Sequence, residues 1–147
     1  MTGEGSSPVV VDASIVIKWL TFEKGSNAAL ELLRKWVSED VAILAPPLLL
    51  YEVANVLHQR VRRGQLNSAQ ARSLMGEILA FPVTYDRDPE QSIDAAMRLA
   101  DDLGLSAACD AAYLALADRV RGVVWTADRR FGDLAGRAWA VNVLADN

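Results

Sequence analysis

The run Val9–Val11 consists of three consecutive β-branched residues, and it leads directly into Asp12 in the sequence PVVVDAS. β-branched residues favour strands, and a strand that is apolar at successive positions has both of its faces buried. Such strands are typical of parallel sheets that carry helices on both sides. The run therefore predicts a short buried strand over residues 8–14 in a fold of the α/β class.

The rest of the chain alternates in the same way between apolar runs and stretches with helical spacing. Pro46 and Pro47 suit the first turn of a helix, Asn67 suits an N-cap, and Gly64 and Gly104 suit helix ends. Further strands are predicted at 41–46, 82–85, 122–126 and 138–143. Helices are predicted at 14–20, 26–37, 46 to about 63, 67 to about 80, 89–103, 106–120 and from 128 onwards. This order predicts a three-layer α/β/α fold with a central, mostly parallel sheet flanked by helices.

Length and charge limit the classes of protein that the chain can represent. Its 147 residues fit one domain, so we expect a disordered tail at 1–7 and a single domain at 8–147. A net charge of -4 argues against binding nucleic acid through bulk positive charge. Cys109 is the only cysteine, which excludes an internal disulfide and favours a cytoplasmic location. The sequence has neither a secretory signal pattern nor an apolar stretch of about 20 residues, so we expect no membrane association.

Two aspartates follow predicted strands. Asp12 ends the first strand, and Asp128 follows the strand GVVWT. Each could simply cap the next helix, because an aspartate accepts hydrogen bonds from free backbone N–H groups. The carboxyl ends of parallel strands, however, meet at one edge of the sheet, which is where such folds bind ligands. We therefore expect the two carboxylates to lie close together.

Two more acidic residues occupy unusual positions on predicted helices. Glu52 lies in the apolar stretch LLLYEVANVL, and at about 100° per residue it shares a narrow stripe with Asn55, Gln59 and Arg62 or Arg63. The stripe can be a thin solvated face, or a groove with a carboxylate at one end and phosphate-binding cations at the other. Asp110 lies in the first turn of a helix, where it complements the helix dipole, but its neighbours are small and apolar.

One geometry explains all four acids, namely convergence at one end of the sheet. Clustered carboxylates repel one another unless a cation neutralises them, and Mg²⁺ or Mn²⁺ prefers oxygen ligands. A metal held in this way suits phosphodiester hydrolysis, because it generates a nucleophilic hydroxide and stabilises the leaving oxygen. It also allows an acidic protein to attract a polyanion. The candidate catalytic and metal-binding residues are Asp12, Glu52, Asp110 and Asp128.

Three segments together resemble the PIN domain, and more narrowly the VapC-type toxins of bacterial toxin–antitoxin pairs. They are VVVDASIVIKWL, LLLYEVANVL and CDAAYLALADRVRGVVWTADRRF. The resemblance implies a Mg²⁺- or Mn²⁺-dependent ribonuclease, often a homodimer, that acts on RNA and is inhibited by a VapB-like antitoxin. It places the four acids above at the family's metal site.

The same resemblance suggests supporting roles for two hydroxyl residues. Ser14 and Thr126 match positions that we expect to orient the acids or their waters. The alternative is that both side chains only form hydrogen bonds to the backbone at the strand ends.

Particular residues bear on other functions that the chain could have. A phosphatase with an aspartyl nucleophile needs a second aspartate two residues after Asp12, where this chain has Ser14. A non-catalytic PIN-like module that binds RNA or a partner protein remains open. The sole histidine, His58, lies away from the Glu52 stripe and is not expected to act as a general base. The sequence assigns no role to Arg62, Arg63, Arg129 and Arg130.

Two expectations concern packing. Among the four tryptophans, Trp125 and Trp139 are expected in the core, whereas Trp19 and Trp36 are expected on a dimer or antitoxin surface. Cys109 is expected to be a small packing residue.

Overall fold

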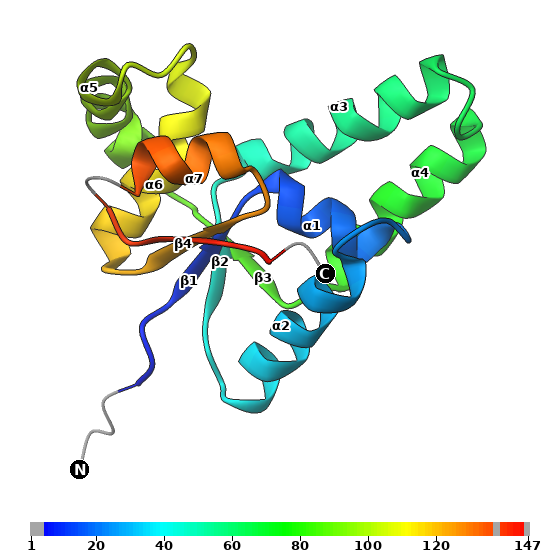
Figure 1. Cartoon of the computed structure of the whole chain (residues 1–147), viewed down its shortest axis with the longest axis horizontal. Helices are drawn as coiled ribbons and strands as arrows, with labels where there is room; N and C mark the ends of the chain where they lie inside the picture. The colour runs from blue at the N-terminus through cyan, green and yellow to red at the C-terminus, as the bar shows by residue number, and fades with distance from the viewer. Residues whose placement is uncertain (1–4, 137–138, 146–147) are drawn as a thin grey trace.

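The computed structural model describes residues 5–136 and 139–145 (Figure 1). Five strands form one sheet in the order β3-β2-β1-β4-β5, and all neighbouring strands are parallel. β1 lies at the centre with all three of its residues buried, as expected for a strand covered on both faces. The predicted central parallel sheet is therefore confirmed. The strands are β1 (Val9–Val11), β2 (Ile43–Ala45), β3 (Val83–Tyr85), β4 (Val123–Thr126) and β5 (Val141–Val143).

The helices cover both sides of this sheet, which confirms the three-layer α/β/α fold. In Figure 1, α1 and α2 lie on one side of the strands, and α5 and α6 lie on the other. α3 and α4 pack against each other and project beyond the sheet. Within the described ranges, no helix has the length and hydropathy needed to cross a bilayer. The helices are α1 (Ala13–Leu20), α2 (Ser26–Ser38), α3 (Leu48–Arg62), α4 (Ser68–Glu77), α5 (Ile93–Leu103), α6 (Ala108–Val120) and α7 (Arg129–Ala135).

Most helix ends follow the predicted signals. Asn67 caps α4 and forms a reciprocal capping box with Gln70, while Gly64 adopts φ +75° after α3. Two predicted helices contain 3-10 turns, η1 (Ile78–Ala80) after α4 and η2 (Pro89–Ser92) before α5. Residues 1–4 of the predicted tail and residue 138 of the last predicted strand lie outside the described residues.

The expectation for Trp19 and Trp36 was wrong, because both side chains are buried in the core. The Trp19 indole donates a 2.9 Å hydrogen bond to the carbonyl of Ala29, and its ring packs against Trp36 and Phe81. Trp36 in turn packs edge-on against Trp125 of β4. Each tryptophan lies on the apolar face of its own helix, and both faces are buried in the core of the protein.

Candidate active site

The four predicted acids line one pocket of about 140 Å³. β1 and β4 are neighbouring parallel strands, so the residues that follow them, Asp12 and Asp128, come to the same edge. α3 and α6 bring Glu52 and Asp110 to the same place from either side. The full lining is Asp12, Ala13, Ser14, Glu52, Asp110, Tyr113, Asp128 and Phe131.

Asp12 is an N-cap and a pocket residue at the same time. Its Oδ1 accepts a hydrogen bond of 3.3 Å from the backbone N–H of Ile15, which caps α1. The same oxygen accepts a bond of 2.5 Å from the hydroxyl of Ser14. The capping interpretation and the pocket interpretation of this residue are thus compatible.

Asp128 is likewise the N-cap of α7 and a residue of the pocket lining. Its Oδ1 accepts a 3.2 Å bond from the backbone N–H of Phe131, and its own N–H donates to the Thr126 hydroxyl at 3.0 Å. The caps fix where each carboxylate stands, because each one starts a helix immediately after a buried strand.

Ser14 joins the two strand ends. Its hydroxyl donates to Asp12 and accepts a 2.8 Å bond from the backbone N–H of Ala127. It also lies 3.3 Å from the hydroxyl oxygen of Thr126, which is fully buried. Ser14 and Thr126 both lie beside the acids. Ser14 is bonded to the Asp12 carboxylate and to the backbone of Ala127, and Thr126 accepts a bond from the backbone N–H of Asp128.

Tyr113 lines the pocket and was not predicted from the sequence. Its hydroxyl donates a hydrogen bond of 2.5 Å to Oε1 of Glu52. The two residues are 61 positions apart in the chain, so no local pattern connects them. The available signal was its place three residues after Asp110, on the same face of α6.

Burial and mutual repulsion make the carboxylates harder to ionise. Burial raises the pKa of Asp12 to about 6, the hydrogen bonds from Ser14, Thr126 and Ile15 oppose this rise, and the charge of Glu52 adds to it. Burial also raises the pKa of Glu52, which the Tyr113 hydrogen bond lowers and the Asp110 charge raises. The pKa of Asp110 is raised by burial and then by the charge of Asp128. Each acid is therefore coupled to the next around the pocket.

The same environment keeps Tyr113 protonated. Burial, followed by its hydrogen bond to Glu52 and the nearby carboxylate charges, raises the pKa of the Tyr113 phenol well above its usual value. The hydroxyl is consequently a stable donor toward Glu52 throughout the neutral pH range.

The donor set of the pocket fits a hard divalent cation by its chemistry, since it consists of carboxylate and hydroxyl oxygens. A cation would also relieve the repulsion that contributes to the raised pKa values of Asp12, Glu52 and Asp110. In residues 5–136 and 139–145, however, no three acidic, histidine or cysteine side chains are arranged so as to hold a metal ion. The Asp12 carboxylate instead accepts a hydrogen bond from Ser14, and the Glu52 carboxylate accepts one from Tyr113.

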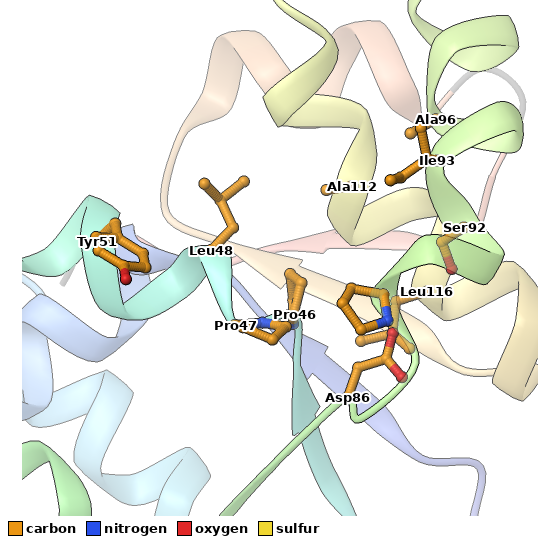
Figure 2. Close-up of a pocket in the computed structure, with 11 residues that line it drawn as sticks. Pro46, Pro47, Leu48, Tyr51, Asp86, Ser92, Ile93, Ala96, Ala112 and Leu116 are labelled. Atoms are coloured by element: carbon orange, nitrogen blue, oxygen red, sulfur yellow. The ribbon is translucent and has the colours of Figure 1, made fainter.

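A larger pocket of about 300 Å³ lies between the start of α3, α5 and α6 (Figure 2). Its lining is mostly apolar and includes Leu48, Ile93 and Leu116. Asp86, the carboxylate that borders it, forms an ion pair with Arg119. This pocket lacks the cluster of acids needed for phosphate chemistry, so the smaller pocket is the candidate active site.

Several other residues singled out in the sequence lie elsewhere. His58 is exposed and borders a separate pocket between α3 and α4. Arg62, Arg63 and Arg130 are exposed. Cys109 is exposed as well, so its predicted role in packing was wrong.

Comparisons with known proteins bear on the family and the fold of the chain. The family model described as the PIN domain matches residues 9–137. The chain is 31% identical over 126 residues to the ribonuclease VapC3 of Pyrobaculum aerophilum, covering 85% of this chain and 92% of that protein. It is also similar to the crystal structure of PAE2754 from the same organism, with a TM-score of 0.64, 26% identity, and coverage of 97% of this chain and 90% of that one. The chain therefore belongs to the PIN domain family, as a VapC-type member.

Proposed function

We propose that the chain is a metal-dependent endoribonuclease and the toxin component of a type II toxin–antitoxin system. One observation carries the proposal: four carboxylates from four separate segments of the chain line a single pocket. The raised pKa values of Asp12, Glu52 and Asp110 support a site that a cation would neutralise. The resemblance to a protein named as a ribonuclease supports RNA as the substrate.

In this proposal Asp12, Glu52, Asp110 and Asp128 hold Mg²⁺ or Mn²⁺. When bound, such a cation would activate a water molecule as the nucleophile and would neutralise charge on the scissile phosphate. Ser14 keeps Asp12 in place, Thr126 supports the backbone of Asp128, and Tyr113 keeps Glu52 in place. Family membership further supports a VapB-like antitoxin, a homodimer and a cytoplasmic location as parts of the proposal.

A non-catalytic PIN-like module that binds RNA or a partner is the second candidate. The observation that favours it is that no three of the described acids are already arranged around a metal position. The two candidates differ in one respect that can be measured, because only the nuclease requires a metal to break RNA.

The test is cleavage of a mixed RNA pool by the purified protein in EDTA, Mg²⁺ or Mn²⁺. Asp110→Asn is compared with Asp118→Asn, which changes an exposed acid on the same helix and serves as the matched control. We expect cleavage only with metal, loss of cleavage in Asp110→Asn, and full cleavage in Asp118→Asn. Metal-independent cleavage, or an active Asp110→Asn variant with native circular dichroism, would contradict the nuclease proposal.

A further inference from the structure

The loop between α1 and α2 presents Phe22 to solvent with 93% of its side chain exposed. Among the described residues, no other large apolar side chain is exposed to this extent. A single exposed apolar residue is ordinary on a protein surface, so exposure by itself implies nothing. The loop around Phe22, however, is fixed and carries several charged residues.

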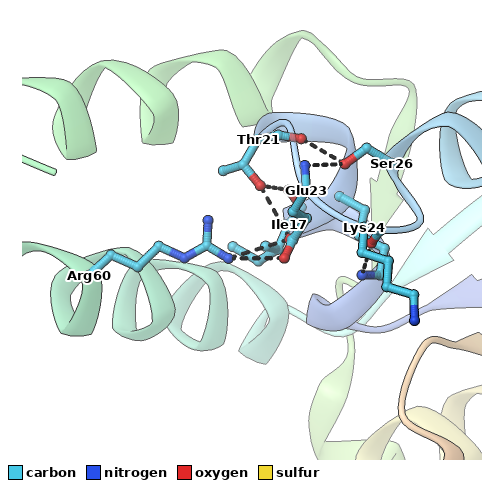
Figure 3. Close-up of polar contacts among 7 residues, drawn as sticks. Ile17, Thr21, Glu23, Lys24, Ser26 and Arg60 are labelled. Atoms are coloured by element: carbon cyan, nitrogen blue, oxygen red, sulfur yellow. Dashed lines mark hydrogen bonds and ion pairs between the residues drawn. The ribbon is translucent and has the colours of Figure 1, made fainter. Parts of the chain in front are cut away.

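The loop backbone around Phe22 is held by a network of hydrogen bonds (Figure 3). The Thr21 hydroxyl donates to the carbonyl of Ile17, and the Ser26 hydroxyl donates to the carbonyl of Thr21, both at 2.9 Å. The Glu23 N–H donates to the Ser26 hydroxyl at 2.9 Å, and the Ser26 side chain is only 2% exposed. Phe22 is thus displayed by a fixed loop, so little backbone entropy is lost when its ring binds a partner.

The same loop carries a local excess of positive charge in an acidic protein. Glu23 is the acidic residue of the loop. It forms an ion pair with Arg60 of α3, whose Nη2 lies 3.3 Å from each carboxylate oxygen. The Lys18 ammonium donates a 2.6 Å bond to the backbone carbonyl of Lys24, which holds the Lys18 side chain at the loop, and Lys24 is itself an exposed loop residue. Three cations and one paired acid therefore lie at the loop that carries Phe22, and this charge favours an anionic partner.

The loop is continuous with the carboxylate pocket through two helices. α1 begins at the pocket with Asp12, and α3 borders the pocket with Glu52. At the other end, the Glu23–Arg60 contact joins the loop after α1 to the last turns of α3. Arg63 is the C-cap of α3 and follows Glu52 by 11 residues, so its Cα lies about 16 Å further along the helix axis and about 20° around it. The acids and the Phe22 loop thus lie at opposite ends of α1, and Arg63 lies at the end of α3 that contacts this loop.

We infer that Phe22 is a stacking platform for a base of single-stranded RNA, with Lys24 and Arg63 contacting the backbone phosphates. An exposed aromatic ring flanked by cations is the combination that binds single strands, since every base has a face that can stack. The inference rests on the proposed function, because it takes the strand to be the substrate of the carboxylate pocket. It gives the cationic end of the Glu52 helix the phosphate-binding role that the sequence left open.

The test measures binding of a fluorescent, random-sequence 12-nucleotide RNA to the full chain in EDTA, where metal-dependent cleavage cannot interfere. Phe22→Ala and Phe22→Leu are each expected to weaken binding about tenfold, whereas Phe22→Trp retains it. Met97→Ala, which removes an exposed apolar side chain from α5 on the other side of the sheet, is the matched control and leaves binding unchanged. Lys24→Gln is expected to make the plot of log affinity against log salt concentration less steep, by about the amount that one phosphate contact contributes.

The outcomes separate this inference from the proposed function. RNA binding that depends on Phe22, without cleavage in any metal, would support the stacking platform while contradicting the nuclease. Equal RNA affinity of wild type and Phe22→Ala would overturn the inference even if metal-dependent cleavage is intact, and would leave Phe22 to a protein partner. Equal loss in Phe22→Ala and Met97→Ala would also overturn it, because the effect would not be specific to the ring.

Discussion

The hydroxyl of Tyr113 donates a 2.5 Å hydrogen bond to Oε1 of Glu52 and so joins α6 to α3 across the pocket. This bond opposes the effect of burial, which raises the pKa of Glu52, and it fixes the carboxylate in the pocket that Asp110 also lines. A neutral phenol in this place stabilises the ionised form of Glu52, which is the form that binds a cation.

Tyr113→Phe is expected to lower kcat/KM for metal-dependent RNA cleavage by about tenfold, because one hydrogen bond to a charged acceptor is worth about 1.5 kcal/mol or more. The ring remains, so packing of the buried side chain is preserved. Titration of the Glu52 carboxyl by NMR is expected to give a higher pKa in the variant. An unchanged pKa together with unchanged activity would contradict a role for this bond.

Asp12 is expected to make the metal-free protein less stable as the pH rises. Its pKa is about 6 in the folded chain against 3.8 as the ordinary value, so the folded state binds the proton more tightly. Its contribution is most favourable below about pH 4 and is lost as the pH rises through about 6, by up to about 3 kcal/mol. Asp12→Asn removes this dependence.

The measurement for Asp12 is urea unfolding of both proteins in EDTA from pH 4 to pH 8. The difference in unfolding free energy between Asp12→Asn and wild type is expected to grow with pH. A constant difference across this range would show that the folded environment does not raise the pKa of Asp12.

Ser14→Ala is expected to lower the free energy of unfolding by about 1–3 kcal/mol, because it leaves the Ala127 N–H without its acceptor and removes the shorter of the two hydrogen bonds to Oδ1 of Asp12. Ser38→Ala is the control, since that exposed hydroxyl bonds to a carbonyl of its own helix. Thermal unfolding of the two variants provides the comparison. Equal stability of both variants would contradict a linking role for Ser14.

Gly132→Ala is expected to destabilise the protein by about 1–3 kcal/mol, because an added Cβ would lie 2.2 Å from the Val143 side chain. The close approach of α7 to β5 depends on this glycine, and α7 begins at Asp128. Gly76→Ala in α4 meets no atom within 4 Å and is expected to be neutral or stabilising. Similar unfolding temperatures for the two variants would contradict this account.

Much of the fold could be read from local patterns. Consecutive apolar residues at Val9–Val11 indicated a strand covered on both sides, and Asn67 and Gly64 marked helix ends through their backbone chemistry. Trp19 and Trp36 were misplaced because an apolar helix face does not reveal whether it meets the protein's own sheet or a partner. Whether such a face is buried depends on which side of the sheet the helix packs against, and local sequence patterns do not specify that side.

The sequence by itself determined that acids follow buried strands and interrupt apolar helices, because strand and helix periods are local properties of the chain. The tertiary structure alone decided that β1 lies beside β4, so that Asp12 and Asp128 meet at one edge. It also decided the pairing of Tyr113 with Glu52, since long-range contacts follow from strand order and helix packing. The raised pKa values belong to this second group, because burial and repulsion exist only once the four segments come together.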